Sequence, residues 1–139
     1  MAKYLGLDLG SRTCGVAISD PSGFLARIYE TVRFKDDDYD TCAKRILEIC
    51  EKEKVNDVVL GLPKHMNGDI GIRGKISEDF KNKLLQIKNL NVILWDERLS
   101  TVAASRAMIE GNRRREFRKE HKDELAAVII LQSYLDFKK

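Results

Sequence analysis

The stretch Tyr4-Leu-Gly-Leu-Asp8-Leu-Gly10-Ser-Arg-Thr-Cys14-Gly-Val-Ala-Ile-Ser19 decides the fold. Its two apolar runs predict short β-strands, and residues 10–13 have the composition of a hairpin turn. In the first strand three alternating leucines share one face, and Asp8 points to the other. An ionised carboxylate inside so apolar a strand is costly unless it is paired or binds a cation. Asp8 is therefore the first candidate for a functional residue.

The remaining elements predict an α/β domain. A third strand, with Phe24, Ala26, Ile28 and Val32 on one face, would complete an antiparallel meander ending near residue 34. Buried strands are predicted at residues 55–62 and 92–95. Helices are predicted after the acidic triplet 36–38, over 75–88, from 100 or 101 to 109, and over 123–137. The order predicts a mixed five-stranded sheet, with three antiparallel strands first and flanking helices.

Two of these helices have apolar stripes that predict which side chains are buried. The helix after the acidic triplet would bury Cys42, Ala43, Ile46, Ile49 and Cys50, and the helix over 75–88 would bury Ile76, Phe80, Leu84 and Ile87. The centre of the last helix, residues 126–131, is apolar all round and should be deeply packed.

Length and composition narrow the classes of protein. The 139 residues suit one domain over 1–139, and 43% hydrophobic with 34% charged residues is typical of a globular chain. No run is as long as a transmembrane helix and the N-terminus lacks a signal-peptide pattern, so we expect a cytoplasmic protein without membrane partners. Cys14, Cys42 and Cys50 have no zinc-ligand spacing, which predicts reduced, buried thiols.

Acidic residues follow the predicted strands and begin the last helix. Asp8 ends the first strand, Asp96 and Glu97 follow the fifth, and Asp123 begins the last helix. Ligands of open α/β sheets bind beyond the carboxyl ends of the strands, so these carboxylates can meet there. Gathered carboxylates select Mg²⁺ or Mn²⁺, and two such ions can clamp a phosphoryl displacement. Metal binding is the favoured interpretation of the set.

Each part also has a plainer interpretation. Asp123 could cap a helix, and residues 96–98 could be a loop with a surface ion pair. Residues 64–74, with Lys64 and His65, could be a lid that touches phosphates or an ordinary loop. Residues 112–122 contain six Lys or Arg against two Glu, which suits either a solvated charge run or a clamp for a nucleic-acid backbone.

Four stretches resemble the YqgF/RuvX family of RNase H-like nucleases. They are Gly6-Leu-Asp-Leu-Gly-Ser-Arg-Thr-Cys-Gly-Val-Ala-Ile-Ser-Asp20, Val59-Leu-Gly-Leu-Pro-Lys-His-Met-Asn-Gly68, Asp96-Glu-Arg-Leu-Ser-Thr101 and Asp123-Glu-Leu-Ala-Ala-Val-Ile-Ile-Leu-Gln-Ser-Tyr-Leu135. The resemblance implies an RNase H-like fold and metal-dependent hydrolysis of phosphodiester bonds. It places the catalytic, metal-binding acids at Asp8, Glu97 and Asp123, with Asp96 the weaker member of its pair.

The family resemblance also implies a substrate. It favours maturation of the 5′ end of 16S ribosomal RNA, with pre-rRNA as partner, and leaves resolution of branched DNA at Holliday junctions as an alternative. We expect nucleic acid to be bound by Arg12, Lys64, Arg98, Arg113, Arg114, Arg115 and Arg118. The oligomeric state stays open. Two rival hypotheses are a non-catalytic nucleic-acid-binding module and an actin-like ATPase, which shares the opening motif but needs two such domains.

Overall fold

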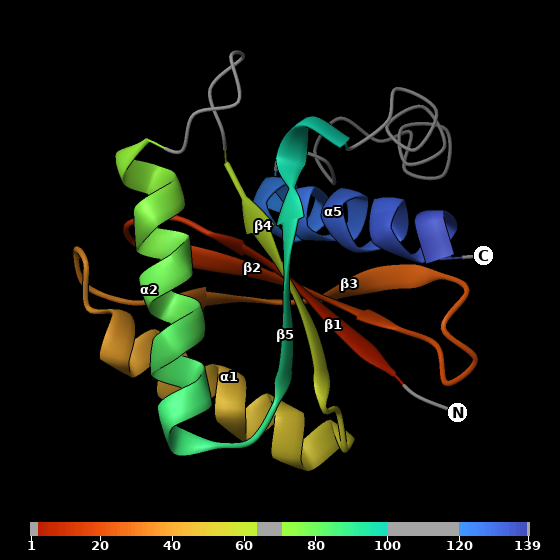
Figure 1. Ribbon diagram of the computed structural model, residues 1–139, viewed down its shortest axis with the longest axis horizontal. Helices are drawn as coiled ribbons and strands as arrows, with labels where there is room; N and C mark the ends of the chain where they lie inside the picture. The colour runs from red at the N-terminus through yellow and green to blue at the C-terminus, as the bar shows by residue number, and fades with distance from the viewer. Residues whose placement is uncertain (1–2, 64–70, 100–119, 139) are drawn as a thin grey trace.

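The computed structural model describes residues 3–63, 71–99 and 120–138. Its elements in these segments are β1 (Tyr4–Leu9), β2 (Thr13–Ser19), β3 (Ala26–Arg33), α1 (Tyr39–Glu53), β4 (Asp57–Leu62), α2 (Ile72–Ile87), β5 (Asn91–Asp96), a 3-10 turn (Glu97–Leu99) and α5 (Lys122–Lys138) (Figure 1). The helix expected over residues 100–109 lies outside the described residues. None of the described helices is long and apolar enough to cross a membrane.

The strands form one mixed sheet in the order β3-β2-β1-β4-β5. β1 pairs with β2, and β2 with β3, in antiparallel fashion, while β4 and β5 run parallel to β1. The parallel strands are reached through α1 and α2, as parallel pairing requires a crossover. The predicted sheet, with its three antiparallel strands first, is confirmed.

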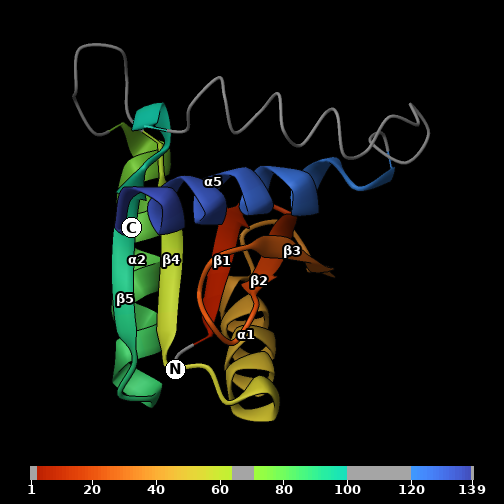
Figure 2. The ribbon, with the colours of Figure 1, turned by 90° about the vertical axis from the view of Figure 1, so that its right-hand side faces the viewer.

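The helices cover the two faces of the sheet unequally. α1 and α2 lie on one face, where their apolar side chains pack on Leu5, Leu7 and Leu9, and α5 lies alone on the other. Figure 2 shows α5 running across the strands, from β2 and β3 at its start toward β5 at its end. Asp8 belongs by alternation to the face that α5 covers.

Small residues let α5 approach this face closely. A Cβ atom at Gly6 would lie 2.6 Å from Leu131 Cβ and 3.1 Å from the Ala127 carbonyl oxygen. The space beside Asp8 that Gly6 leaves is therefore filled by α5. Ala127, Val128 and Leu131 are completely buried there, which confirms the deep packing expected for the centre of the last helix.

The third strand departs from the predicted alternation. Val16 pairs with Glu30 but Ala17 pairs with Ile28, so Tyr29 is an extra residue in a β-bulge. Ala26 and Ile28 pack under α5, whereas Val32 belongs to the core beneath α1 and α2. The prediction that Val32 shares a face with Ile28 was wrong, because a bulge reverses the alternation beyond it. Phe24, also predicted to lie on this strand, precedes it and is exposed.

The helices on the opposite face mostly follow the sequence pattern. Asp38 caps α1 by accepting a hydrogen bond from the Thr41 backbone N–H at 3.3 Å, and the whole predicted stripe of α1 is buried. α2 begins earlier than expected, at Ile72, and buries Phe80 and Leu84. Ile87 was predicted to be buried but is 62% exposed, because it is the last residue of α2 and extends past the sheet.

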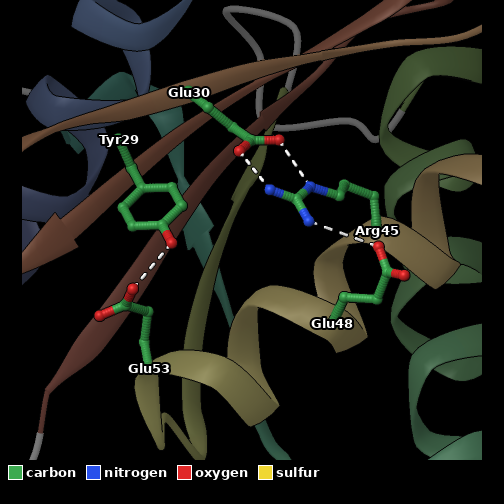
Figure 3. A network of polar contacts seen from close by, with 5 residues as sticks. All are labelled: Tyr29, Glu30, Arg45, Glu48 and Glu53. Carbon is green, nitrogen blue, oxygen red and sulfur yellow. Dashed lines mark hydrogen bonds and ion pairs between the residues drawn. The ribbon is translucent and has the colours of Figure 1, made fainter.

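A polar network fastens the edge strand β3 to α1 (Figure 3). The Arg45 guanidinium donates to both carboxylate oxygens of Glu30, at 2.8 and 2.6 Å, and to Glu48 at 3.4 Å. The Tyr29 hydroxyl donates to Glu53 at 2.8 Å. The two-pronged contact fixes the angle of α1 against the sheet, since both planar groups must align. All three cysteines are free and buried, as predicted.

Candidate active site

Asp8 lies near the carboxyl end of β1 and is half-buried. On β2 its neighbour is Gly15. On β4 the pairing of Leu7 with Leu60 places Gly61, the next residue, beside Asp8. Both neighbouring positions are glycines, so no side chain from β2 or β4 shields the Asp8 carboxylate. The Asp8 carboxylate, on the central strand β1, is therefore left uncovered by the side chains of β2 and β4 on the face that α5 packs against.

Glu97 reaches this carboxylate from the far side of β4. It begins the 3-10 turn directly after β5, and its Oε1 would lie 2.7 Å from a Cβ atom at Gly61. The side chain thus crosses β4 above Gly61 and comes within hydrogen-bonding reach of Asp8. Gly61 makes the contact possible, although in the sequence it is only one residue of an apolar run.

Burial and the neighbouring charges alter the pKa values of both carboxyl groups. Burial, followed by the charge of Asp8 and the hydrogen bond to it, raises the pKa of Glu97 to about 7. Burial and the charge of Asp123 raise the pKa of Asp8, while the hydrogen bond from Glu97 and the charge of Arg73 act in the opposite direction. Glu97 is therefore the proton donor and Asp8 the acceptor, the arrangement expected of crowded carboxylates.

Asp123 approaches from α5. Its carbonyl oxygen would lie only 1.9 Å from a Cβ atom at Gly15, the partner of Asp8, so the start of α5 lies on the same face of the sheet as Asp8. Its charge acts on the Asp8 carboxyl group. Within the described residues, however, no three acidic, histidine or cysteine side chains already form a cluster that could hold a metal ion.

Asp96, the alternative acid, pairs with Leu62 as the last residue of β5. The alternation along the strand sends its side chain to the face opposite that of Trp95, which packs under α5. Asp96 therefore points away from the face on which Asp8 lies, which agrees with its place as the weaker member of the pair.

A pocket of about 220 Å³ opens beside the acidic pair. Asp8 and Glu97 form its polar side, and Ala126, Ile129 and Ile130 of α5 form an apolar wall. The apolar wall contributes to the desolvation that raises the pKa of Glu97, and it keeps charge–charge interactions in the pocket strong.

Glu124, the residue after Asp123, holds the start of α5 in place and does not belong to the acidic site. Its carboxylate accepts hydrogen bonds from the Thr31 hydroxyl on β3 and from His121 Nδ1, the latter at 2.7 Å. Burial alone would raise the pKa of Glu124, but these two donors lower it. The anchor fixes the residue next to Asp123 over β2 and β3.

Arg73 was not predicted from the sequence. It lies in the first turn of α2, and its Nη2 donates a 3.0 Å hydrogen bond to the Leu9 carbonyl, one residue beyond Asp8. Its positive charge acts on both Asp8 and Glu97. The proximity depends on where the start of α2 lies relative to the end of β1, and no local sequence pattern predicts it.

The predicted nucleic-acid contacts are only partly within the described residues. Arg12 lies in the exposed β1–β2 turn at the same end of the sheet as Asp8, and its guanidinium pairs with Asp36. The backbone of Arg98 belongs to the 3-10 turn beside Glu97. Outside the described residues lie Lys64, Arg113, Arg114, Arg115 and Arg118.

The acidic pair fits a hard divalent cation. Both side chains offer carboxylate oxygens, which Mg²⁺ and Mn²⁺ prefer, and a bound cation would relieve the repulsion that raises the pKa of Glu97. Asp123 would add a third ligand if its side chain turned toward the pair. His and Cys ligands, which would favour zinc, do not line the described pocket.

Comparison with solved structures identifies the fold. The chain superimposes on T. thermophilus RuvC in complex with a Holliday junction substrate with a TM-score of 0.68 at 11% identity, covering 99% of this chain and 95% of that one. For the fowlpox virus Holliday junction resolvase the TM-score is 0.58 at 15% identity, with 99% of each chain covered. The protein therefore has the RNase H-like fold of the RuvC-like resolvases, a class of nucleases.

Sequence comparison then identifies the family. The family model RuvX, described as Holliday junction resolvase, matches residues 2–137. A protein of Staphylococcus carnosus (strain TM300) named "Putative pre-16S rRNA nuclease" is 47% identical over 135 residues, or 96% of this chain and 95% of that protein. A Staphylococcus aureus (strain JH9) protein of the same name is 46% identical with the same coverage. The chain belongs to the RuvX family of nucleases, so the resemblance of its four motifs is confirmed.

Proposed function

We propose that this protein is a metal-dependent nuclease that matures the 5′ end of 16S ribosomal RNA in the cytoplasm. The observation that carries the proposal is the pair of carboxyl groups that Asp8 and Glu97 bring together in a pocket at the carboxyl end of β1. Two partly buried carboxylates placed next to each other are costly in free energy, because burial and mutual repulsion both penalise their charged forms. Such a pair suits a site that binds a cation during its working cycle.

Asp8, Glu97 and Asp123 would hold Mg²⁺ or Mn²⁺ in this site. The bound ion would supply the positive charge that activates water and stabilises the phosphoryl group during displacement. The chain itself positions the ligands: β1 fixes Asp8, Gly61 admits Glu97, and the anchor at Glu124 places Asp123 over Gly15. The apolar wall formed by α5 excludes water from one side of the pocket.

The relatives supply the substrate part of the proposal. The staphylococcal proteins are named for pre-16S rRNA, and they share nearly half of their residues with this chain over almost its whole length. The family description instead names the Holliday junction, so a branched DNA substrate is the second candidate. In both cases Arg12, Lys64, Arg98 and the arginines of residues 113–118 are the proposed contacts with the phosphate backbone.

The test is a side-by-side cleavage assay. A 5′-labelled RNA spanning the leader and the mature 5′ end of 16S rRNA and a labelled four-way DNA junction are each incubated with the protein and Mg²⁺. We expect cleavage of the RNA that stops with EDTA and with Asp8→Asn. Cleavage of the junction alone would transfer the function to DNA. Tight binding of both without cleavage would favour a non-catalytic binding module and overturn the proposal.

A further inference from the structure

The Arg73 side chain of α2 contacts two other elements. Its Nη2 donates to the Leu9 carbonyl at the end of β1, and the guanidinium also lies within hydrogen-bonding reach of the Tyr39 hydroxyl at the start of α1. Tyr39 in turn donates to Asp37 at 3.0 Å. One backbone acceptor and one side chain thus hold the guanidinium near enough to Asp8 and Glu97 for its charge to act on both.

This arrangement differs from that of a structural ion pair. Among the described residues, Arg73 forms no ion pair with Asp8 or Glu97, although its charge acts on both of them. Its side chain is exposed, and a guanidinium has five N–H donors, of which the protein's contacts use only a part. Arg45 shows the contrast within the same molecule, because two carboxylates occupy its guanidinium.

The charges near the pocket suit an anion bound between a cation and Arg73. Asp8 and Glu97, which line the pocket, would hold the cation, and Arg73, anchored one residue beyond Asp8, keeps unused N–H donors. An anion bound there would contact positive charge on both sides. A phosphate diester has two nonbridging oxygens, one for each side, and the planar guanidinium fork matches such oxygens.

We propose that Arg73 binds a nonbridging oxygen of the substrate phosphate that lies against the Asp8–Glu97 pair, with the Leu9 carbonyl and the Tyr39 hydroxyl holding its guanidinium in place. The inference rests on the proposed nuclease function and adds a substrate-binding residue that the basic segments of the sequence do not contain. The proposed phosphate contact also gives a reason for the charge of Arg73, since an uncharged side chain could donate the same hydrogen bond to the Leu9 carbonyl oxygen.

The experiment measures binding as a function of salt concentration. A fluorescently labelled single-stranded RNA carrying the 16S leader is titrated with the full-length protein, with Ca²⁺ replacing Mg²⁺ so that the RNA is not consumed. Arg73→Gln should weaken binding roughly tenfold at low salt. It should also lower the slope of log K against log salt by about 0.7, the value for one phosphate contact on a single strand.

Two further variants separate a phosphate contact from other effects. Arg73→Lys keeps the charge and should keep most of the salt slope while losing part of the affinity, because an ammonium lacks the planar fork. Arg27→Gln removes another exposed charge, at the start of β3 and far along the strand from the Asp8 end of the sheet. This control variant should leave the affinity and the salt slope unchanged. Thermal unfolding of every variant is recorded alongside.

The outcomes distinguish this proposal from the proposed function. An Arg73→Gln variant that melts earlier but keeps the wild-type affinity and slope would make Arg73 a structural clip and overturn the proposal. Equal losses in Arg73→Gln and Arg27→Gln would also overturn it, since they would report only net charge. If the wild-type protein binds neither RNA nor junction, the nuclease function itself fails.

Discussion

Glu97 meets Asp8 by crossing over Gly61, so the acidic pair spans three adjacent strands of the sheet. Its geometry depends on a residue that has no side chain. Any side chain at position 61 would occupy the path of Glu97, with a Cβ atom only 2.7 Å from Glu97 Oε1. A glycine in an interior strand normally weakens it, and here that cost accompanies the passage of Glu97 to Asp8.

The raised pKa of Glu97 predicts how stability depends on pH. In the folded protein this pKa is about 7, against an ordinary value of 4.5, so the folded state binds more protons than the unfolded state between these values. The contribution of Glu97 to stability is therefore fully present below pH 4.5 and is lost as the pH rises through 7. Without metal, the melting temperature relative to Glu97→Gln should fall from about pH 5 to about pH 8.

Magnesium should reverse this trend. A cation must displace the proton on Glu97, so Mg²⁺ binding should tighten as the pH rises through 7, and added Mg²⁺ should raise the melting temperature more at about pH 8 than at about pH 6. Calorimetric titration at the two pH values provides the check. A Mg²⁺ affinity independent of pH would contradict the assignment of Glu97 as a ligand.

Asp8→Asn should abolish cleavage without harming the fold. The amide still accepts the hydrogen bond from Glu97, and removal of the charge ends the repulsion with Asp123. We therefore expect a melting temperature equal to or above that of the wild type in the absence of metal, and loss of the Mg²⁺-induced increase. Wild-type cleavage rates in Asp8→Asn at unchanged stability would rule Asp8 out as a metal ligand.

Two glycine substitutions should separate stability from activity. Gly15→Ala would place its Cβ atom 1.9 Å from the Asp123 carbonyl oxygen, so the backbone of α5 must move, at a cost of about 1–3 kcal/mol. Gly61→Ala meets only the movable ends of Glu97 and Ile130. It should cost less stability but lose cleavage, because Glu97 is displaced from Asp8. Denaturant unfolding and the cleavage assay together test the pair, and equal effects of both substitutions would contradict this division.

The network between β3 and α1 predicts a contrast between two arginines. Arg45→Met leaves the partly buried Glu30 carboxylate without its two-pronged partner, and we expect a loss of about 1 kcal/mol in the free energy of unfolding. Arg12→Met removes a fully exposed pair with Asp36 and should leave stability unchanged. Urea denaturation of both variants in high and low salt is the measurement.

Much of the fold could be predicted because local patterns and tertiary packing agree. The leucines of β1 alternate, the stripe of α1 recurs at helical spacing, and both are buried as expected. The bulge at Tyr29 could not be predicted, since a strand with one extra residue has no distinct composition. Ile87 was wrongly predicted to be buried, because the apolar spacing of α2 continues to its last residue although the helix no longer packs on the sheet there.

The candidate site divides in the same way. Asp8 could be proposed because a carboxylate contradicts the apolar strand around it, and Glu97 and Asp123 because they follow or begin predicted elements; the structure shows that both lie near Asp8. Gly61 and Arg73 could not be found in this way. Their roles depend on which strands lie side by side and on how α2 starts relative to β1, and both are relations between distant parts of the chain.

The position of α5 has a consequence for protein synthesis. One face of the sheet can pack with α1 and α2 as soon as β5 has been made, but Asp123 and the apolar wall of the pocket belong to a helix that is translated after all five strands. A nascent chain therefore acquires its sheet and half of its core before it acquires the third acid. Catalytic competence would arrive only when α5 docks across the strands, so an incomplete chain at the ribosome could not attack the RNA around it.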